Sequence, residues 1–189
     1  MASVSTPHLL TAEEYGQLDE VLGFRDELIE GERVLSPSPV SPHAAIIDQL
    51  RDILAAQLSQ ISGEQLRLVQ ETGVKFRRPS SGLDSIPVPD LMIVPEEQWR
   101  RAVKNRSWFE GAPLIVIEVI SPSERRMRRM QKVGLYLEMG VPCVIEADYT
   151  RRVVLVYTPD ADAAAVYRAG DQITSPFRAA VSEIFSVLD

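Results

Sequence analysis

The chain has 189 residues, of which 45% are hydrophobic, and this length and apolar content fit one globular domain over residues 1–189 better than two small ones. The formal net charge of −7 argues against a protein that coats nucleic acid through its whole surface. No stretch approaches the roughly 18 apolar residues of a membrane span, and the N-terminus lacks a basic region followed by an apolar run, so we expect a cytoplasmic protein with no membrane partner.

The N-terminal part of the chain predicts a short helix followed by a β-hairpin. Thr11 and Glu14 form a capping box, which is typical of a helix that begins near Ala12. The segment DELIEGERVL, residues 26–35, has the pattern of a hairpin whose turn contains Glu30 and Gly31.

A long amphipathic helix is predicted to follow this hairpin. Ser41 can act as its N-cap, with Pro42 in the first turn. Apolar residues then recur at helical spacing from Ile46 to Ile61, and we expect the helix to end near Gly63.

The rest of the chain predicts strands and a second long helix. Ser123 can cap this helix, which should end near Gly140. The segment 114–120 is the most apolar strand, so we place it at the sheet centre. The last thirty residues read as short strands and turns, and Cys143 lies in an apolar run that predicts inert core packing. The predicted strands cover residues 65–77, 90–94, 114–120, 141–147 and 153–157.

Two carboxylates interrupt the apolar strands. Asp90 follows Pro89 at a strand start, and Glu118 stands within LIVIEVI, residues 114–120. A buried charge is costly unless it is paired or bound to metal. Carboxylates that project from adjacent strand ends can converge and bind Mg²⁺ or Mn²⁺, with waters and a phosphate oxygen completing the shell. The structural alternative is that Asp90 caps a turn while Glu118 pairs with a basic residue of the next helix.

The helix after Glu118 is strongly basic at its start. Its cations Arg125, Arg128, Arg129 and Lys132 are three or four residues apart and share one face. This face can bind the phosphates of nucleic acid, or it can simply be solvated. Lys132 can reach toward the carboxylate pair, where an ammonium can orient or help deprotonate an attacking water and stabilise charge on phosphate. Together these residues predict a site that cleaves phosphodiesters.

Six short motifs along the chain carry a family resemblance. They are ELIEGE (27–32), SPSPVSPH (36–43), PDL (89–91), EVISPS (118–123), Lys132 with Tyr136, and GVP (140–142). In this order they resemble the Uma2 family of nucleases, which belongs to the restriction-endonuclease-like PD-(D/E)XK superfamily. The resemblance extends over nearly the whole chain.

The resemblance implies a fold and a metal site. The fold would be α/β (α+β), with a restriction-endonuclease-like mixed central sheet of four to five strands flanked by helices and extended by additional N- and C-terminal strands. Asp90 and Glu118 would bind the divalent metal. In the usual superfamily motif a lysine lies two residues beyond the second acid, where this chain has Ile120. Lys132, on the following helix, is the residue that matches the family's displaced lysine.

Further roles and partners follow from the same resemblance. Glu27 would complete or support the metal site. His43 occupies the family's histidine position, where helix capping or a structural role is an alternative to an auxiliary role in catalysis. Superfamily members that cut both strands often pair their active sites, so DNA as partner and a homodimer are expected by analogy.

Two departures from the family pattern leave the site residues intact. Arg128 stands where relatives often show an acidic residue, and Val144 and Ile145 stand where they commonly show Tyr-Trp. The first change makes the helix more basic, and a core can absorb the second. The sequence thus favours a metal-dependent endonuclease. The alternatives are a non-catalytic nucleic-acid or protein interaction module on the same fold, and a hydrolase of another phosphate ester.

Overall fold

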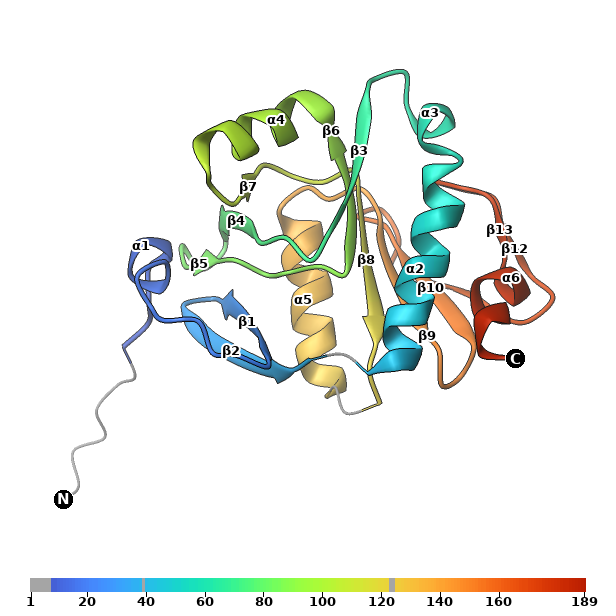
Figure 1. Cartoon of the computed structure of the whole chain (residues 1–189), viewed down its shortest axis with the longest axis horizontal. Helices are drawn as coiled ribbons and strands as arrows, with labels where there is room; N and C mark the ends of the chain where they lie inside the picture. The colour runs from blue at the N-terminus through green and yellow to red at the C-terminus, as the bar shows by residue number, and fades with distance from the viewer. Residues whose placement is uncertain (1–7, 39, 123–124) are drawn as a thin grey trace.

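The computed structural model describes residues 8–38, 40–122 and 125–189, which are arranged around a six-stranded sheet (Figure 1). The strand order is β11-β10-β9-β8-β6-β3, in which β8 and β9 are parallel and the other neighbours are antiparallel. The strands are β3 (Leu66–Gln70), β6 (Leu91–Pro95), β8 (Ile115–Ile120), β9 (Val144–Asp148), β10 (Val153–Tyr157) and β11 (Ala165–Tyr167).

Helices and smaller sheets surround this sheet. The helices are α1 (Ala12–Tyr15), α2 (Ser41–Ala55), α3 (Leu58–Ile61), α4 (Glu96–Asn105), α5 (Arg126–Glu138), α6 (Val181–Phe185) and the 3-10 helix η1 (Ser186–Leu188). The shorter strands pair as β1 (Phe24–Ile29) with β2 (Glu32–Pro37), β4 (Val74–Arg77) with β5 (Asp84–Ser85) and β7 (Phe109–Glu110), and β12 (Gln172–Ile173) with β13 (Ala179–Ala180). The architecture is the mixed sheet flanked by helices that the sequence predicts.

Strand β8 lies inside the sheet, between β6 and β9, as predicted for the most apolar segment. Because side chains alternate along a strand, Ile117 packs in the cluster that contains α2, whereas Val116 packs in the cluster that contains α5. Glu118 is two residues from Val116, and its carboxylate contacts α5. Strand β8 therefore presents the carboxylate of Glu118 to α5.

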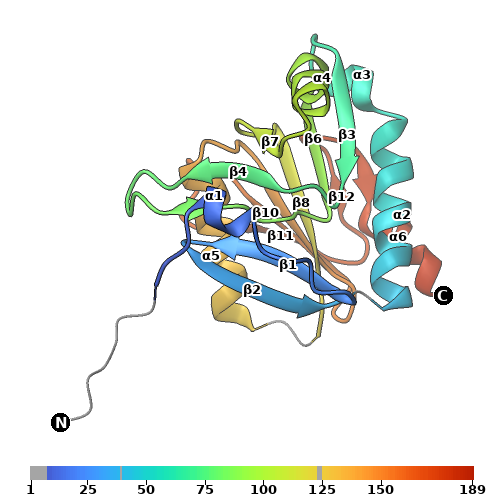
Figure 2. The same ribbon diagram turned by 60° about the vertical axis from the view of Figure 1, so that its left-hand side comes forward.

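The two faces of the sheet are covered by different helices (Figures 1 and 2). On one face, Leu50 of α2 and Ile184 of α6 belong to one buried cluster with β8. On the other, Val133 and Tyr136 of α5 pack with Phe109 of β7. Both faces are thus apolar except where charged side chains interrupt the α5 side.

The predicted hairpin is formed by β1 and β2, and it packs against α5. Its two-residue turn places Glu30 and Gly31 at φ values of 50° and 79°, as a type I′ turn requires. Ile29 and Val34 are buried against Leu135 of α5. The hairpin is therefore fixed to the helix that carries Lys132.

The helix boundaries differ from prediction in two places. The N-cap of α2 is Val40, and Ser41 is its first helical residue, without a capping hydrogen bond. The helix ends at Ala55 because Gln57 exchanges hydrogen bonds with the backbone of Arg178, from a segment that local sequence patterns could not place beside it. The capping box of Thr11 is confirmed, and Ser123, the predicted cap of α5, lies outside the described residues.

Two further differences concern the strand 65–77 and helix α4. The predicted strand is broken into β3 and β4 by a turn in which Glu71 has a φ of 43°. Helix α4 was not predicted, because its residues are mostly polar or charged and only Ala102 among them is buried. Ion pairs between residues four apart, such as Glu96 with Arg100 at 2.8 Å, support such an exposed helix.

Two minor sequence expectations can also be compared with the structure. Cys143 is buried in the core as predicted, and burial raises the pKa of its thiol to about 11. Across the part of the chain that the structure describes, none of the helices combines the length and the apolar character needed to cross a membrane.

The packing of α2 on the sheet predicts the effect of removing one core side chain. Leu50 is fully buried, so Leu50→Ala should destabilise the protein by about 3 kcal/mol. Val103, on α4, is 57% exposed, and Val103→Ala should change stability by less than about 0.5 kcal/mol. Urea denaturation of both variants measures the difference. Equal free energies of unfolding for Leu50→Ala and Val103→Ala would contradict the packing of α2 on the sheet.

Candidate active site

Asp90 lies directly before β6 and is the most deeply buried acid of the site, with 1% of its side chain exposed. Its Oδ2 accepts a hydrogen bond from the backbone N–H of Val119 at 2.6 Å and lies 3.3 Å from Nε2 of His43. Its Oδ1 is paired with the guanidinium of Arg25. Burial alone would raise the pKa of Asp90, but the hydrogen bond from His43 and the charge of Arg25 outweigh it and lower the pKa. Asp90 is therefore kept ionised.

Glu118, on β8, lies beside Asp90 because β6 and β8 are antiparallel neighbours with Leu91 opposite Ile117. Its Oε1 accepts a hydrogen bond from the hydroxyl of Tyr136 at 2.7 Å and is 2.8 Å from Nζ of Lys132. Burial raises the pKa of Glu118 to about 8, and the charge of Lys132 opposes this only in part. The pKa values of the two neighbouring carboxylates are thus shifted in opposite directions, and perturbed pKa values cluster at active sites.

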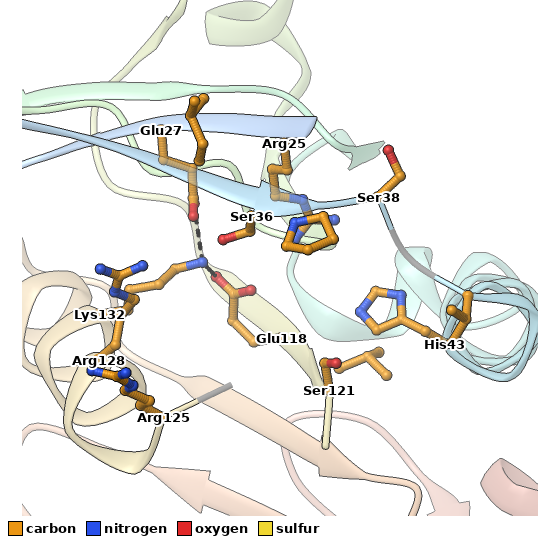
Figure 3. A pocket seen from close by; sticks show the side chains of 14 residues that line it. Arg25, Glu27, Ser36, Ser38, His43, Glu118, Ser121, Arg125, Arg128 and Lys132 are labelled. Atoms are coloured by element: carbon orange, nitrogen blue, oxygen red, sulfur yellow. Dashed lines mark ion pairs between the residues drawn. The ribbon is translucent and has the colours of Figure 1, made fainter. Parts of the chain in front are cut away.

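Lys132 joins α5 to two other parts of the fold. Its Nζ lies 3.0 Å from Oε1 of Glu27 and 2.8 Å from Oε1 of Glu118, and 6% of its side chain is exposed. Figure 3 shows the ammonium between the two carboxylates, one from the hairpin and one from the sheet. Tyr136 is one helical turn further along α5 and contacts the same Glu118 oxygen.

Glu27 and Arg25 enter the site from β1. Oε1 of Glu27 also accepts a hydrogen bond from the backbone N–H of Val88 at 2.7 Å. Arg25 pairs with Asp90 and also lies 3.3 Å from the exposed carboxylate of Glu71. The charge of Asp90 and, to a lesser extent, that of Glu118 raise the pKa of Arg25 despite the opposing effect of burial. Glu27 therefore supports the site by holding Lys132.

His43 is buried in the first turn of α2. Its Nε2 faces Asp90 at 3.3 Å, whereas its Nδ1 has no hydrogen-bond partner among the described residues. The cap of the helix is Val40 and not His43. This placement favours a role in the site over a helix-capping role.

The three predicted nucleic-acid-binding arginines are in different environments. Arg125 and Arg128 are exposed and line the cavity above Glu118. Arg129 instead forms a two-point contact with buried Glu146, at 3.1 Å and 2.9 Å, and Tyr157 donates to the same carboxylate at 2.8 Å. For Arg129 the predicted phosphate contact stays a prediction, and it would require loss of this ion pair.

A cavity of about 540 Å³ connects these groups. Figure 3 shows the hairpin on one side, β8 and α5 on the opposite side, and the start of α2 at the end. It is lined by Arg25, Glu27, Leu35, Ser36, Pro37, Ser38, Val40, His43, Glu118, Val119, Ser121, Arg125, Arg128 and Lys132.

The carboxylates of the site are possible oxygen ligands for a divalent metal ion such as Mg²⁺. Among residues 8–38, 40–122 and 125–189 there is no group of three His, Cys, Asp or Glu side chains that could hold a metal ion. Mg²⁺, however, is usually bound through one or two carboxylates, with waters and substrate phosphates as further ligands. Asp90 and Glu118 fit this requirement in donor type and number. Glu27 is not part of a three-ligand group.

Arg25 and Glu146 are parts of the site region that sequence reasoning missed. Arg25 could have been found, because it is two residues from Glu27 on a strand and so shares its face. Glu146 interrupts the predicted strand 141–147 as Glu118 interrupts its own strand, but its position opposite Glu118 depends on the pairing of β8 with β9.

Comparison with known proteins identifies the family of this chain and a solved structure with a similar fold. The Uma2 model, described as "Putative restriction endonuclease", matches residues 12–181. The crystal structure of a "putative nuclease belonging to DUF820" from Anabaena variabilis ATCC 29413 has a TM-score of 0.78 and 22% identity, and the match covers 95% of this chain and 99% of that chain. This likeness shows the fold.

Two other comparisons add nothing to this assignment. The cryo-EM structure of a DrdV–DNA complex matches with a TM-score of 0.36 and 14% identity, over 78% of this chain and 13% of that chain, which is too weak to use. The search of curated proteins found no match. Because the family model spans most of its length, the chain belongs to the Uma2 family of the restriction-endonuclease-like nucleases.

Proposed function

We propose that this protein is an endonuclease that hydrolyses DNA phosphodiester bonds with a divalent metal ion, Mg²⁺ or Mn²⁺, held by Asp90 and Glu118. The observation that carries the proposal is the ammonium of Lys132, buried between Glu27 and Glu118. A buried cation beside two carboxylates of a cavity is costly to maintain. A role in phosphoryl transfer would explain this arrangement, because a positioned cation stabilises the charge that develops on the phosphate.

The bound metal would supply Lewis acidity and activate water for in-line attack. Asp90 is suited to bind it because this carboxylate is ionised, and the pairing with Arg25 keeps Asp90 in place. Tyr136 fixes the orientation of Glu118 through its hydrogen bond. These two contacts position the metal-binding groups before substrate arrives, which reduces the reorganisation needed during catalysis.

Lys132 and the exposed arginines would act on the substrate itself. Nζ of Lys132 lies within 3.0 Å of both Glu27 and Glu118, and we assign to it charge stabilisation on the phosphate. Arg125 and Arg128, which line the cavity, would bind the phosphates next to the cleaved bond. Cleavage of both strands of a duplex would require two such sites, as in a homodimer.

Lys132 provides the direct test of catalysis. Wild-type protein should nick plasmid DNA with Mg²⁺ or Mn²⁺ but not with EDTA. Lys132→Ala should lose about 100-fold or more in rate, because the ammonium acts on charge that develops in the transition state. Lys132→Arg should recover little of this loss, because a planar guanidinium cannot replace a compact ammonium.

The control for this experiment is Arg151→Ala, which removes an exposed cation on the β9–β10 turn. It should cleave at the wild-type rate. Equal rates for Lys132→Ala and wild type would remove Lys132 from the mechanism. Absence of cleavage by the wild type with either metal would favour the non-catalytic interaction module.

The pKa of Glu118 predicts how metal binding depends on pH. A carboxyl with a pKa of about 8 must lose its proton before it can bind metal. Its raised pKa also makes the metal-free protein less stable as pH rises from about 4.5 to about 8, since the folded state binds the proton more tightly. The rise in melting temperature caused by Mn²⁺ should therefore be larger at pH 8.5 than at pH 6.

A matched pair of variants checks this assignment. Glu118→Gln should remove the pH-dependent part of the Mn²⁺ effect, whereas Glu97→Gln, at a side chain that is 89% exposed, should retain it. Thermal unfolding at the two pH values with and without Mn²⁺ measures the effect. If Mn²⁺ raises the melting temperature of Glu118→Gln by as much as that of the wild type at both pH values, Glu118 is excluded as a metal ligand.

A further inference from the structure

The groups assigned to catalysis lie in a recess. The exposed fractions of the Glu27, Asp90 and Lys132 side chains are 5%, 1% and 6%. A scissile phosphate must enter the cavity to reach them. Duplex DNA is stiff, with a persistence length of about 50 nm, so a paired strand cannot bend sharply to follow a narrow cavity.

The hairpin of residues 24–37 covers this recess, and we refer to it as the roof hairpin. Figure 3 shows it across the site from β8 and α5. It is held in place by the ion pair between Glu27 and Lys132 and by the packing of Ile29 and Val34 on Leu135. These contacts make the roof hairpin a fixed wall of the cavity.

The size of the cavity limits what can enter. Its volume of about 540 Å³ lies within the range of roughly 300–1,000 Å³ that is typical of small-molecule sites. Such a volume suits one or two nucleotides. It is too small for the two paired strands of a duplex.

One wall of the cavity is apolar and the opposite wall is positively charged, which suits a single strand of DNA. On the side of the roof hairpin and the start of α2, Leu35, Pro37 and Val40 present apolar surface. On the side of α5, Arg125 and Arg128 present positive charge. Proteins that bind single strands combine a cationic groove for the backbone with side chains, usually aromatic, that contact the bases; here Leu35, Pro37 and Val40 offer aliphatic contact instead.

The charge of the whole chain agrees with a local contact. At −7 the protein repels the phosphates of a long duplex except where its cations are concentrated. Binding of duplex DNA depends strongly on the number of phosphates that a protein neutralises. Two exposed arginines at one cavity wall can neutralise the backbone of a short segment only.

We propose that the substrate segment of this nuclease is single-stranded DNA, such as an unpaired tail, which enters the cavity under the roof hairpin with its phosphates toward α5 and its bases toward Leu35. This inference rests on the proposed nuclease function. It names the form of DNA that the site accepts.

Binding measurements can distinguish a preference for single-stranded DNA from a preference for duplex DNA. The probes are a fluorescent 12-nucleotide strand, its blunt duplex, and the duplex with a six-nucleotide tail, measured by anisotropy in EDTA so that no cleavage occurs. The single strand and the tailed duplex should bind at least tenfold more tightly than the blunt duplex. With Mn²⁺, cleavage of the tailed duplex should fall in the tail or at its junction. Equal or tighter binding of the blunt duplex would overturn the inference.

A pair of matched variants tests the apolar wall. Leu35→Ser should weaken binding of the single strand several-fold, whereas Val166→Ser should not, although the two residues are 39% and 40% exposed on edge strands. Melting temperatures of both variants serve as the folding control. Unchanged strand affinity in a folded Leu35→Ser protein would exclude the wall from the binding site.

Failure of this inference can be told apart from failure of the nuclease function. Faster cleavage of the blunt duplex than of the single strand would overturn the inference and leave the nuclease function standing. Preferential binding of the single strand without cleavage by any divalent metal would support the inference about the bound strand and contradict the nuclease function.

Discussion

The contact of Lys132 with two carboxylates determines how three segments of the chain meet. Its ammonium is nearly buried and binds Glu27 from the hairpin and Glu118 from the central sheet, while its helix packs on both. Removing one partner from such a buried pair typically costs about 3–5 kcal/mol, because it leaves a buried charge uncompensated. The charges of the site thus also fix the position of the hairpin, and under the proposed function substrate access and catalysis would depend on the same contact.

Much of the site could be predicted because buried charge is unusual in an apolar strand. Asp90 and Glu118 were visible as interruptions of apolar segments, and Lys132 as a cation of the basic face that could reach them and that matches the family's displaced lysine. The structure brings Glu118 and Lys132 to 2.8 Å. The structural alternative, in which Glu118 pairs with a cation of the next helix, describes the same contact.

Other features could not be predicted because they depend on contacts between distant segments. The contact of Arg129 with Glu146 follows from the pairing of β8 with β9, and the end of α2 follows from contacts between Gln57 and Arg178. Helix α4 was missed for a different reason. Its residues are mostly polar or charged and only Ala102 is buried, so it lacks the apolar run of residues that identifies most helices in a sequence.

The most direct test of the metal site is a crystal of the wild-type protein soaked in Mn²⁺ and measured for anomalous scattering. A peak in contact with the carboxylate oxygens of both Asp90 and Glu118 is the predicted result, and the peak should be absent from Asp90→Asn crystals treated in the same way. A Mn²⁺ peak that contacts neither carboxylate, or no peak at a concentration that supports DNA cleavage, would contradict the assignment of these two residues as metal ligands.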